Sequence, residues 1–227
     1  MPETKAIYTL NIGMNYAPEI CALTYPLFRE YAAKIGADFV IIDERQFLEW
    51  PIVYEKLQIH KRGRAYDWNI YFDSDCLIHP DLFDLTEAIS KDTILQNSQD
   101  YAGNRFVYDE YFRRDGRHIG ACNWFTVASK WCLDLWKPLD DLTLEEAVKR
   151  IHIISAEKKA GIENEHLIDD FVLSRNIARY GLKQQTFSQL LVALNRQMDE
   201  YFWHTYTFTI EEKVKGMQET LARWGLI

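Results

Sequence analysis

Residues 68–78 of this chain read WNIYFDSDCLI, an apolar run that leads into two carboxylates, Asp73 and Asp75. The apolar part, residues 68–72, has the length and composition of a buried β-strand. Carboxylates that are buried without partners are costly, so a strand that brings two of them to its end needs a physical reason. Alternate residues of an extended chain point to the same side, so both carboxylates can approach one cation. The segment therefore predicts a divalent metal site, because oxygen ligands suit such ions.

Strand and helix patterns alternate along the sequence before this segment. Residues 6–12 and 38–43 are apolar runs typical of strands, and residues 53–66 have the pattern of a helix. Another helix is expected between the first two strands. This order predicts a parallel α/β sheet with right-handed crossovers, in which ligands bind beyond the carboxyl ends of the strands. The two aspartates lie at such an end.

The helix between the first two strands has clear start and stop signals. Pro18 suits a first helical position, apolar side chains recur on one face over residues 20–35, and Gly36 suits a C-terminal cap. Pro26 lies inside this pattern and predicts a kink or a restart. We therefore expect a helix over residues 18–35 that is disturbed in its middle.

The C-terminal half is less regular. Residues 93–97 and 123–128 predict strands, and residues 101–118 are polar, aromatic and basic, which predicts a long loop of the kind that often serves function. The remaining stretches predict helices over residues 129–136, from 143 to about 159, from 164 to 181, and from 209 onward.

Side chains at the helix starts support three of these helices. Thr143 with Glu146, and Thr209 with Glu212, have the spacing of capping boxes, and Asn164 is a suitable cap. The last helix also has an apolar face, which consists of Ile210, Val214, Met217, Leu221 and Trp224.

The composition limits the class of protein. With 227 residues, 48% of them hydrophobic and 26% charged, the chain can bury a sizeable core as a globular protein. A net charge of −8 argues against nucleic acid as a main partner. Four scattered cysteines without a C-x-x-C pair indicate reduced thiols. The sequence has no signal-peptide pattern and no run of apolar residues long enough to span a membrane, so we expect a cytoplasmic protein.

Five segments, in the same order along the chain, resemble glycosyltransferases with the A-type (GT-A) fold. Residues 66–78 (YDWNIYFDSDCLI) resemble the metal-binding segment of these enzymes, which contains a D-x-D motif. Residues 54–57 (YEKL) are similar to the helix before it, and residues 120–125 (GACNWF) to the acceptor-side strand. Residues 163–173 (ENEHLIDDFVL) resemble an acidic helix beside the reacting sugar, and residues 202–204 (FWH) the segment with a late histidine of the metal site.

This resemblance implies a fold and an activity. The fold is a single Rossmann-like GT-A domain over residues 1–227, with a mostly parallel central sheet flanked by helices. Residues 1 to about 100 would bind the nucleotide sugar, and residues from about 101 to 227 the acceptor. The activity is transfer of a sugar from a nucleotide-sugar donor, with UDP expected, to a hydroxyl of a saccharide, protein or lipid. Mn²⁺ or Mg²⁺ would bridge the diphosphate.

The metal ligands implied by the resemblance are Asp73, Asp75 and His204. Charge that grows on the departing diphosphate favours a cation beside Asp75. In the family the first aspartate often contacts the ribose or reaches the metal through water, which gives Asp73 a second role in substrate binding. An imidazole among carboxylates suits Mn²⁺ better than Mg²⁺. The alternative for His204 is a packed histidine in an aromatic cluster, Tyr201 to Tyr206.

Asp169 and Asp170 are the candidate catalytic residues. A carboxylate here could face the acceptor hydroxyl or the cationic centre of the sugar. The alternative is acidic side chains that stabilise the start of a helix. The spacing of Glu165 from Asp169 and of His166 from Asp170 does not decide between the two aspartates.

The remaining candidates would bind the donor or acceptor. Thr9 and Asn11, at the end of the first strand, and Asp43, at the end of the second, lie where a base and ribose would bind, or they cap the strand ends. Lys56 can reach the phosphates, whereas the basic run 60–64 complements a helix C-terminus. The resemblance adds two further substrate-binding candidates, which are Ser74 and Asn123.

The long loop contributes four basic residues: Arg113, Arg114, Arg117 and His118. They form either a lid over the diphosphate or an exposed basic surface.

Two other functions remain open from the sequence. Phosphohydrolases of the haloacid dehalogenase type also place D-x-D after an apolar strand, with the first aspartate, here Asp73, as nucleophile. In this chain the motif follows a third strand and continues with Cys76 and Leu77, where that family prefers small residues and Thr. The second alternative is a non-catalytic nucleotide-sugar binder on the same fold.

Overall fold

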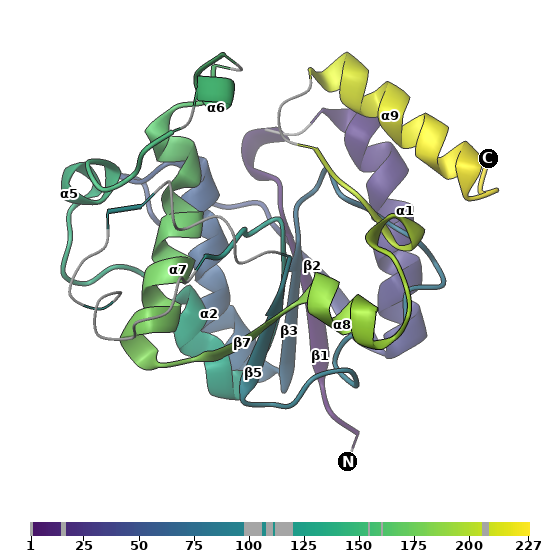
Figure 1. Ribbon diagram of the computed structural model, residues 1–227, viewed down its shortest axis with the longest axis horizontal. Coiled ribbons are helices and arrows are strands. Elements are labelled where there is room, and N and C mark those ends of the chain that lie inside the picture. The colour runs from purple at the N-terminus through teal and green to yellow at the C-terminus, as the bar shows by residue number, and fades with distance from the viewer. Residues whose placement is uncertain are drawn as a thin grey trace.

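The computed structural model describes residues 2–14, 17–97, 106–107, 111, 120–153, 155–159, 161–205 and 209–227. Within these residues a six-stranded sheet has the order β2-β1-β3-β6-β5-β7, and β4 and β8 form a separate two-stranded sheet. Figure 1 labels β1, β2, β3, β5 and β7 of the larger sheet. The strands are β1 (Lys5–Leu10), β2 (Ala37–Ile42), β3 (Trp68–Phe72), β4 (Leu77–Ile78), β5 (Thr93–Gln96), β6 (Phe125–Ser129), β7 (Lys183–Thr186) and β8 (Phe202–Trp203).

The sheet is mixed, with parallel strands predominating. β1 pairs in parallel with β2 and with β3, and β5 pairs in parallel with β7. β6 is the exception, because it runs antiparallel to both β3 and β5. The predicted fold class, a Rossmann-like α/β domain with a mostly parallel sheet flanked by helices, is confirmed.

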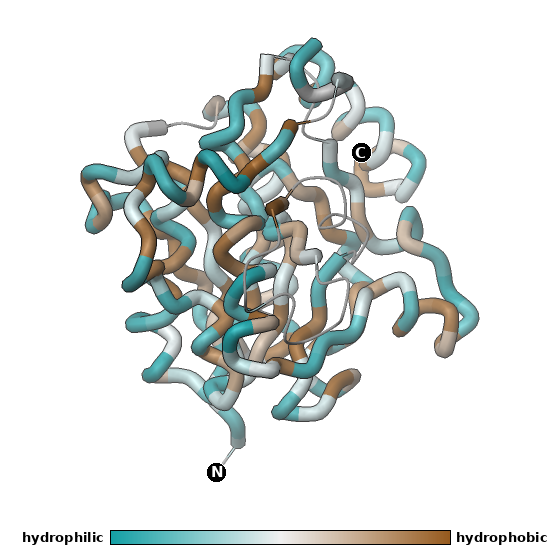
Figure 2. Tube along the Cα trace, turned by 60° about the vertical axis from the view of Figure 1, so that its left-hand side comes forward, coloured by the Kyte–Doolittle hydropathy of each residue, from teal (hydrophilic) through white to brown (hydrophobic). Residues whose placement is uncertain are grey.

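Helices cover both faces of the sheet (Figure 1). On one face α1 (Pro18–Ile35), α8 (Phe187–Ala193) and α9 (Ile210–Arg223) share a hydrophobic cluster. On the other face α2 (Ile59–Arg62) and α7 (Ile168–Tyr180) share a second cluster. The short helices α5 (Leu144–Val148) and α6 (Ser155–Lys159) lie farther from the sheet. Hydrophobic and hydrophilic residues alternate along the helices, as expected when one side of each faces the sheet (Figure 2).

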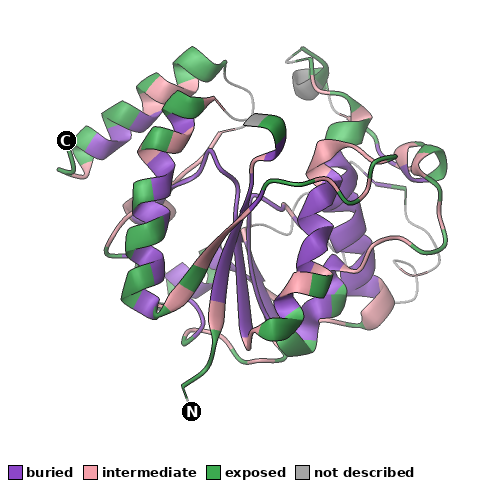
Figure 3. Ribbon diagram, turned by 180° about the vertical axis from the view of Figure 1, so that it is seen from behind, coloured by how far each residue is buried: buried purple, intermediate pink, exposed green. Residues whose placement is uncertain are grey.

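The two clusters arise from strand alternation. Along β1, Ala6, Tyr8 and Leu10 belong to the cluster under α7, while Ile7 belongs to the cluster under α1. β3 and β6 are buried along their whole length (Figure 3). Strands that are covered on both faces read as continuous apolar runs, which is the pattern seen before the two aspartates.

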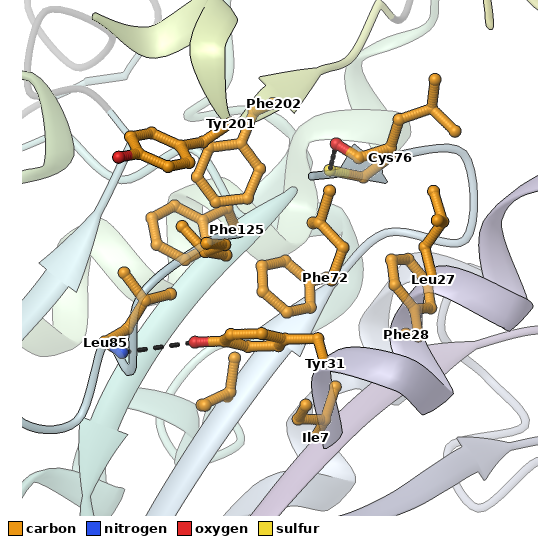
Figure 4. Packing of buried hydrophobic residues seen from close by; sticks show 14 of the residues in the cluster. Ile7, Leu27, Phe28, Tyr31, Phe72, Cys76, Leu85, Phe125, Tyr201 and Phe202 are labelled. Atoms are coloured by element: carbon orange, nitrogen blue, oxygen red, sulfur yellow. Dashed lines mark hydrogen bonds between the residues drawn. The ribbon is translucent and has the colours of Figure 1, made fainter. Parts of the chain in front are cut away.

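Aromatic packing fixes the end of β3. Phe72 stacks on Phe28 from α1 with ring centroids 5.6 Å apart and on Phe125 from β6 at 5.5 Å. Phe202 from β8 packs against the same ring at 6.0 Å. Figure 4 shows this group together with Tyr31. The residue directly before the first aspartate is therefore held by three separate elements.

Most predicted helix signals are confirmed. Pro18 is the first residue of α1, and Gly36 and Gly181 end α1 and α7 in left-handed conformations, with φ of 68° and 62°. Both capping boxes, which begin at Thr143 and Thr209, are formed. Of the kink or restart predicted at Pro26, the restart is wrong, because α1 is continuous from Pro18 to Ile35 with Pro26 inside it, and the kink stays a prediction.

Three predicted elements need correction. The helix expected over residues 53–66 is a 3-10 helix over Ile52–Gln58, followed by α2 and a 3-10 turn over Gly63–Ala65. The helix expected from 143 to 159 ends at Val148, because the chain turns into a β-bridge between Phe106 and Ile151. The helix expected over 129–136 is a 3-10 helix with a kink at Cys132.

Two side-chain predictions are also wrong. Asn164 does not cap a helix; its amide donates to the carbonyl oxygen of Ile151 at 2.7 Å, and Asn164 is itself the first residue of a 3-10 turn. Ile210 lies outside the core face of α9 and is 56% exposed. The strands β7 and β8 and the helix α8 were not predicted.

The four cysteines are free thiols. Among the helices of the described ranges, none combines the length and apolar character that a membrane span requires. The predicted loop 101–118, with Arg113, Arg114, Arg117 and His118, lies outside the described residues except for positions 106, 107 and 111.

Candidate metal centre

The turn after β3 directs the two aspartates. The backbone N–H of Asp73 donates to the carbonyl oxygen of Trp124 at 2.8 Å, and that of Cys76 donates to the carbonyl oxygen of Asp73 at 3.0 Å. The Ser74 side chain points inward and is fully buried. Its hydroxyl lies 2.9 Å from the Thr9 hydroxyl and donates to the carbonyl oxygen of Leu10 at 2.9 Å. Ser74 therefore anchors the turn to β1.

His204 reaches the aspartates because β8 pairs with β4. The register Leu77 with Trp203 brings the segment after β8 beside the turn. One ligand atom from each of Asp73, Asp75 and His204 lies within 4.8 Å of the others, and we call these three residues the metal-site cluster. His204 Nε2 is 3.5 Å from Asp75 Oδ1 and 3.9 Å from Asp73 Oδ2.

Trp124 fixes the orientation of the histidine. Its indole stacks on the His204 ring with centroids 4.7 Å apart and an interplanar angle of 9°. Trp124 is itself nearly buried and packs edge-on against Phe202. A stacked imidazole keeps its ring plane fixed, so Nε2 stays directed at the carboxylates.

Asp75 combines deep burial with an incomplete set of partners. It is 3% exposed, and Oδ2 forms an ion pair with Lys213 from α9. Within the described part of the chain, Oδ1 accepts no hydrogen bond. Burial opposes the charge on Asp75, but the neighbouring His204 and Lys213 outweigh it and hold the pKa of this carboxyl below its ordinary range.

These residues fit a divalent cation. A buried carboxylate oxygen without a partner costs free energy unless a ligand satisfies it. Two carboxylates and an imidazole form a donor set that transition-metal dications bind well. Asp75 Oδ1 accepts no hydrogen bond in the described structure and lies 3.5 Å from His204 Nε2, and a bound cation between these two atoms would satisfy it.

A second group, which we call the lysine-bridged cluster, contains Lys56, Asn123, Asp169 and Asp170. Lys56 is buried, and its ammonium lies 2.8 Å from Asp73 Oδ1 and 2.8 Å from Asp169 Oδ2. It also donates to the carbonyl oxygen of Asn123 at 3.0 Å. Lys56 therefore connects the two clusters.

The two aspartates of α7 differ in environment. Asp169 Oδ2 accepts from Lys56 and from the Asn123 amide, the latter at 3.4 Å. Asp170 Oδ1 accepts the backbone N–H of Asn123 at 2.6 Å. Burial raises the pKa of Asp170 well above its ordinary value, and the negative charge of Asp169 adds to this effect. Asp170 is thus the carboxyl that tends to stay protonated.

Tyr71 supports both clusters from the strand. Its hydroxyl donates to Asp73 Oδ1 at 2.6 Å, and the ammonium of Lys56 lies 5.1 Å from the centre of its ring. Burial and the charge of Asp73 raise the pKa of Tyr71, so the phenol remains protonated and acts as a donor. Tyr71 and Asp73 are two residues apart on an extended chain, which places them on one side.

Both clusters open into one cavity of about 1020 Å³, a volume that suits a ligand of substantial size. Helix α9 borders it closely because it packs on Trp203 at Gly216, where a Cβ atom would lie 2.5 Å from the indole. The described residues that line it are Pro51, Ile52, Val53, Lys56, Asp73, Asp75, Asn97, Cys122, Asn123, Trp124, Gly161, Ile162, Glu163, Glu165, His166, Leu167, Asp169, Asp170, Met198, Phe202, Trp203, His204 and Lys213.

The structure brings six of the predicted site residues to this cavity, besides Lys56: Asp73, Asp75, Asn123, Asp169, Asp170 and His204. The other four lie apart from its described lining. Thr9 and Ser74 are fully buried and bonded to each other. Asn11 follows β1, where its amide lies 3.4 Å from Cys21 Sγ, and Asp43 is exposed after β2.

Four residues that matter to the site were not predicted: Tyr71, Trp124, Lys213 and Gly216. Tyr71 carries a signal, because it lies two residues before Asp73 on the same strand. Trp124 lies in the segment 120–125 that resembles the acceptor-side strand, but its stacking on His204 joins segments far apart in the sequence. Lys213 and Gly216 also depend on long-range contacts, and nothing in their local pattern indicates them.

Comparisons with known proteins identify the fold. No protein-family model and no curated protein matches the sequence. A solved structure, the crystal structure of a glycosyltransferase involved in the glycosylation of the major capsid of PBCV-1, matches with a TM-score of 0.51 and 13% sequence identity. The match covers 94% of this chain and 99% of that chain. At this identity the likeness establishes a shared glycosyltransferase-type Rossmann-like fold.

Proposed function

We propose that this protein is a metal-dependent glycosyltransferase that moves a sugar from a nucleotide-sugar donor, with UDP as the expected nucleotide, to an acceptor hydroxyl. One observation carries the proposal. The metal-site cluster, with its orphaned Asp75 Oδ1, opens into the same cavity as the carboxylates of α7. A cation site beside separate acidic side chains suits transfer of a sugar from a diphosphate, because the cation can stabilise the departing charge.

The cation would be held by oxygens of Asp73 and Asp75 and by Nε2 of His204. When bound, a dication supplies positive charge that stabilises the departing nucleoside diphosphate. Mn²⁺ is the preferred ion, with Mg²⁺ as the alternative, because an imidazole is a better ligand for the former. Trp124 and Tyr71 support the ligands by holding His204 and Asp73 in place.

The reaction breaks the bond between the anomeric carbon and the diphosphate oxygen, which keeps the electron pair. The acceptor oxygen bonds to that carbon, and its proton passes to an oxygen of the departing diphosphate, a base that the reaction itself supplies. Asp169 is the residue that we propose to face the reacting sugar. Its carboxylate is paired with Lys56, whereas the raised pKa of Asp170 favours a neutral carboxyl that holds the backbone of Asn123.

The donor and acceptor would divide the cavity. We propose that the half of the chain up to about residue 100 binds the nucleotide sugar and the later half binds the acceptor, a saccharide, protein or lipid. Asn11 and Asp43 follow the adjacent strands β1 and β2, and this edge is our proposed site for base and ribose. Thr9 and Ser74 would act there by holding the turn.

The likeness of fold supports this proposal in one respect. The solved neighbour is described as a glycosyltransferase, and its fold is shared over almost the whole of both chains. The neighbour therefore shows that this architecture is compatible with glycosyl transfer.

We also propose that the protein acts in the cytoplasm, because free cysteines persist there. Cell fractionation or imaging of a tagged protein can check this location.

Thermal unfolding tests the proposal. UDP together with Mn²⁺ is expected to raise the melting temperature, and Asp75→Ala is expected to abolish the shift because it removes a ligand. Turnover is then measured across a panel of nucleotide sugars. Absence of a shift with every nucleoside diphosphate would count against a glycosyltransferase. A metal-dependent shift without turnover on any donor would favour the non-catalytic binder.

A further inference from the structure

Lys213 is the one residue of α9 whose side chain reaches into the metal-site cluster in the described structure. Its ammonium pairs with Oδ2 of Asp75, and its side chain is only 13% exposed. Its position depends on Gly216, one helical turn later, where α9 packs on Trp203, the residue beside His204. The ion pair joins residues 138 positions apart in the chain.

We propose that Lys213 is a built-in counter-ion, which neutralises Asp75 while no dication is bound and which a dication must displace. The inference rests on the proposed function, since it concerns the same metal site. It goes further, because it makes metal binding depend on the departure of Lys213 from Asp75. An anionic ligand such as a nucleoside diphosphate would then favour the metal-bound state.

The charges around Asp75 limit what can bind there. Asp73, Asp75 and Asp169 carry three negative charges, and in the described structure two ammonium groups face them: Lys56 pairs with Asp73 and Asp169, and Lys213 pairs with Asp75. Adding a dication beside His204 would leave an excess of one positive charge in a buried place. Like charges at such short range repel strongly where the dielectric constant is low. Either a lysine withdraws, or an anion must enter with the metal.

Lys213 is the lysine that can withdraw. Lys56 has at least three oxygen partners in the described structure and is 5% exposed, so it is fixed. Lys213 is more exposed and lies in the first turn of α9, whereas the buried apolar residues of that helix are Met217 and Leu221. A lysine has a long, flexible stem, so rotation of the side chain releases Asp75 without movement of the helix.

The expected size of the effect follows from population arithmetic. If the Lys213–Asp75 contact is closed for about nine-tenths of the time, the apparent affinity for a dication alone falls about tenfold. A nucleoside diphosphate offers negative charge to the released ammonium. Binding of the metal and of the nucleotide must therefore promote each other, and by linkage to the same extent.

The test is a titration of Mn²⁺ alone, without nucleotide, followed through the electron paramagnetic resonance signal of the free ion. Lys213→Met removes the counter-ion, and Lys213→Gln removes the charge but keeps a donor for Asp75, in case the first variant does not fold. Lys215→Met is the matched control. Lys215 lies on the same helix, and its side chain is 78% exposed and pairs only weakly with Glu219, at 4.0 Å.

The two neutral variants of position 213 are expected to bind Mn²⁺ at least about tenfold more tightly than the unmodified protein. Lys215→Met and Lys213→Arg are expected to resemble the unmodified protein. The enhancement of Mn²⁺ affinity by UDP should be smaller in the neutral variants of position 213, because part of it comes from release of the lysine.

Three outcomes would overturn the inference. If the neutral variants bind Mn²⁺ no better than the unmodified protein, while UDP still promotes metal binding, the counter-ion role fails and the proposed function stands. If Lys215→Met strengthens binding equally, the effect is one of general charge and the specific role fails. If no form binds Mn²⁺ even with UDP, the proposed function itself fails.

Discussion

The metal-site cluster and the lysine-bridged cluster lie in one cavity, yet their carboxylates are satisfied in different ways. Asp169 and Asp170 have partners within the protein: an ammonium, a side-chain amide and a backbone N–H. Asp75 has one oxygen paired with Lys213, and its other oxygen accepts no hydrogen bond among the described residues but lies 3.5 Å from His204 Nε2. Burial alone does not separate the two groups, because all three aspartates are nearly inaccessible.

The lysine-bridged cluster is therefore preorganised by its own contacts, whereas the metal-site cluster needs a ligand to complete its contacts. A buried polar atom without a partner is destabilising, so evolution tolerates it where a bound molecule completes the site. A fully bonded network is stable without a ligand and holds its side chains in place. The contrast predicts that substitutions in the lysine-bridged cluster reduce the stability of the fold, whereas substitutions at Asp75 reduce ligand binding.

The largest effect is expected from Lys56→Met, which leaves Asp73 and Asp169 without their shared counter-ion. Loss of one partner of a buried ion pair costs about 3–5 kcal/mol, so the free energy of unfolding should fall by that amount. Denaturation in urea measures it. Lys61→Met, at an exposed position of α2, is the control, with an expected change within about 0.5 kcal/mol. A loss below about 1 kcal/mol in Lys56→Met would show that the network is not preorganised by this lysine.

Asp75→Asn should lower the rate of sugar transfer. The amide cannot supply the negative charge that the cation requires, and loss of one element of electrostatic stabilisation typically lowers turnover about 10²–10³-fold. The measurement is sugar transfer with the best donor of the panel. Asp81→Asn is the control, since the side chain of Asp81 is 88% exposed. Equal activity of Asp75→Asn and the unmodified protein would remove the distinction between the two clusters.

Tyr71→Phe should have a smaller effect, on metal affinity. It removes the hydroxyl that holds Asp73, and loss of such a supporting hydrogen bond weakens metal binding about 10–100-fold. Mn²⁺ affinity in the presence of UDP is the readout. Tyr8→Phe is a close control, because the Tyr8 hydroxyl is also buried but has no hydrogen-bond partner in the described structure. A similar affinity in both variants would mean that the orientation of Asp73 is set elsewhere.

The smallest effect concerns pH. The pKa of Asp170 is raised above its ordinary value of 3.8, so the folded protein binds a proton that the unfolded chain has released. This contribution to the free energy of unfolding is complete below the ordinary pKa and is lost as the pH rises through the raised pKa of the folded protein. Its size is about 1.4 kcal/mol for each pH unit between the ordinary and the raised pKa. Asp170→Asn mimics the protonated form. Its stability relative to the unmodified protein should therefore increase with pH across this range.

Measurements of stability at several pH values also distinguish the two clusters, because the pKa of Asp75 is lowered whereas that of Asp170 is raised. Its stabilising contribution is present above the ordinary pKa and is lost only as the pH falls through the lowered value. Urea denaturation at several pH values, for Asp170→Asn and for the unmodified protein, provides the comparison. A stability difference that is constant with pH would contradict the assignment of Asp170 as the protonated carboxyl.

Local patterns predicted much of the fold. The apolar run that ends at Asp73 identified the central strand, and the caps at Gly36 and Gly181 and the capping boxes at Thr143 and Thr209 identified helix ends. Each of these signals depends on residues close together in the sequence. β7 reads KQQT, which has no apolar alternation, and it is a strand only because β5 pairs with it.

The sequence predicted those residues of the candidate site that carry titratable groups and lie in segments that resemble the glycosyltransferase family. Asp73, Asp75 and His204 were expected together, and they lie together. Lys213 could not be expected, because its place depends on how closely α9 approaches Trp203 at Gly216. The roles expected of Thr9 and Ser74 assumed that strand-end hydroxyls face the ligand, whereas these two hydroxyls face each other inside the protein.

A crystal structure of the protein soaked in Mn²⁺ and UDP tests the metal centre most directly. Anomalous scattering at the manganese edge locates the ion independently of the protein. We predict a peak bounded by Asp73, Asp75 and His204, with the diphosphate on its open side and Asp169 still joined to Asp73 through Lys56. An anomalous peak elsewhere, or UDP bound in the cavity with no metal beside Asp75, would contradict the proposed centre.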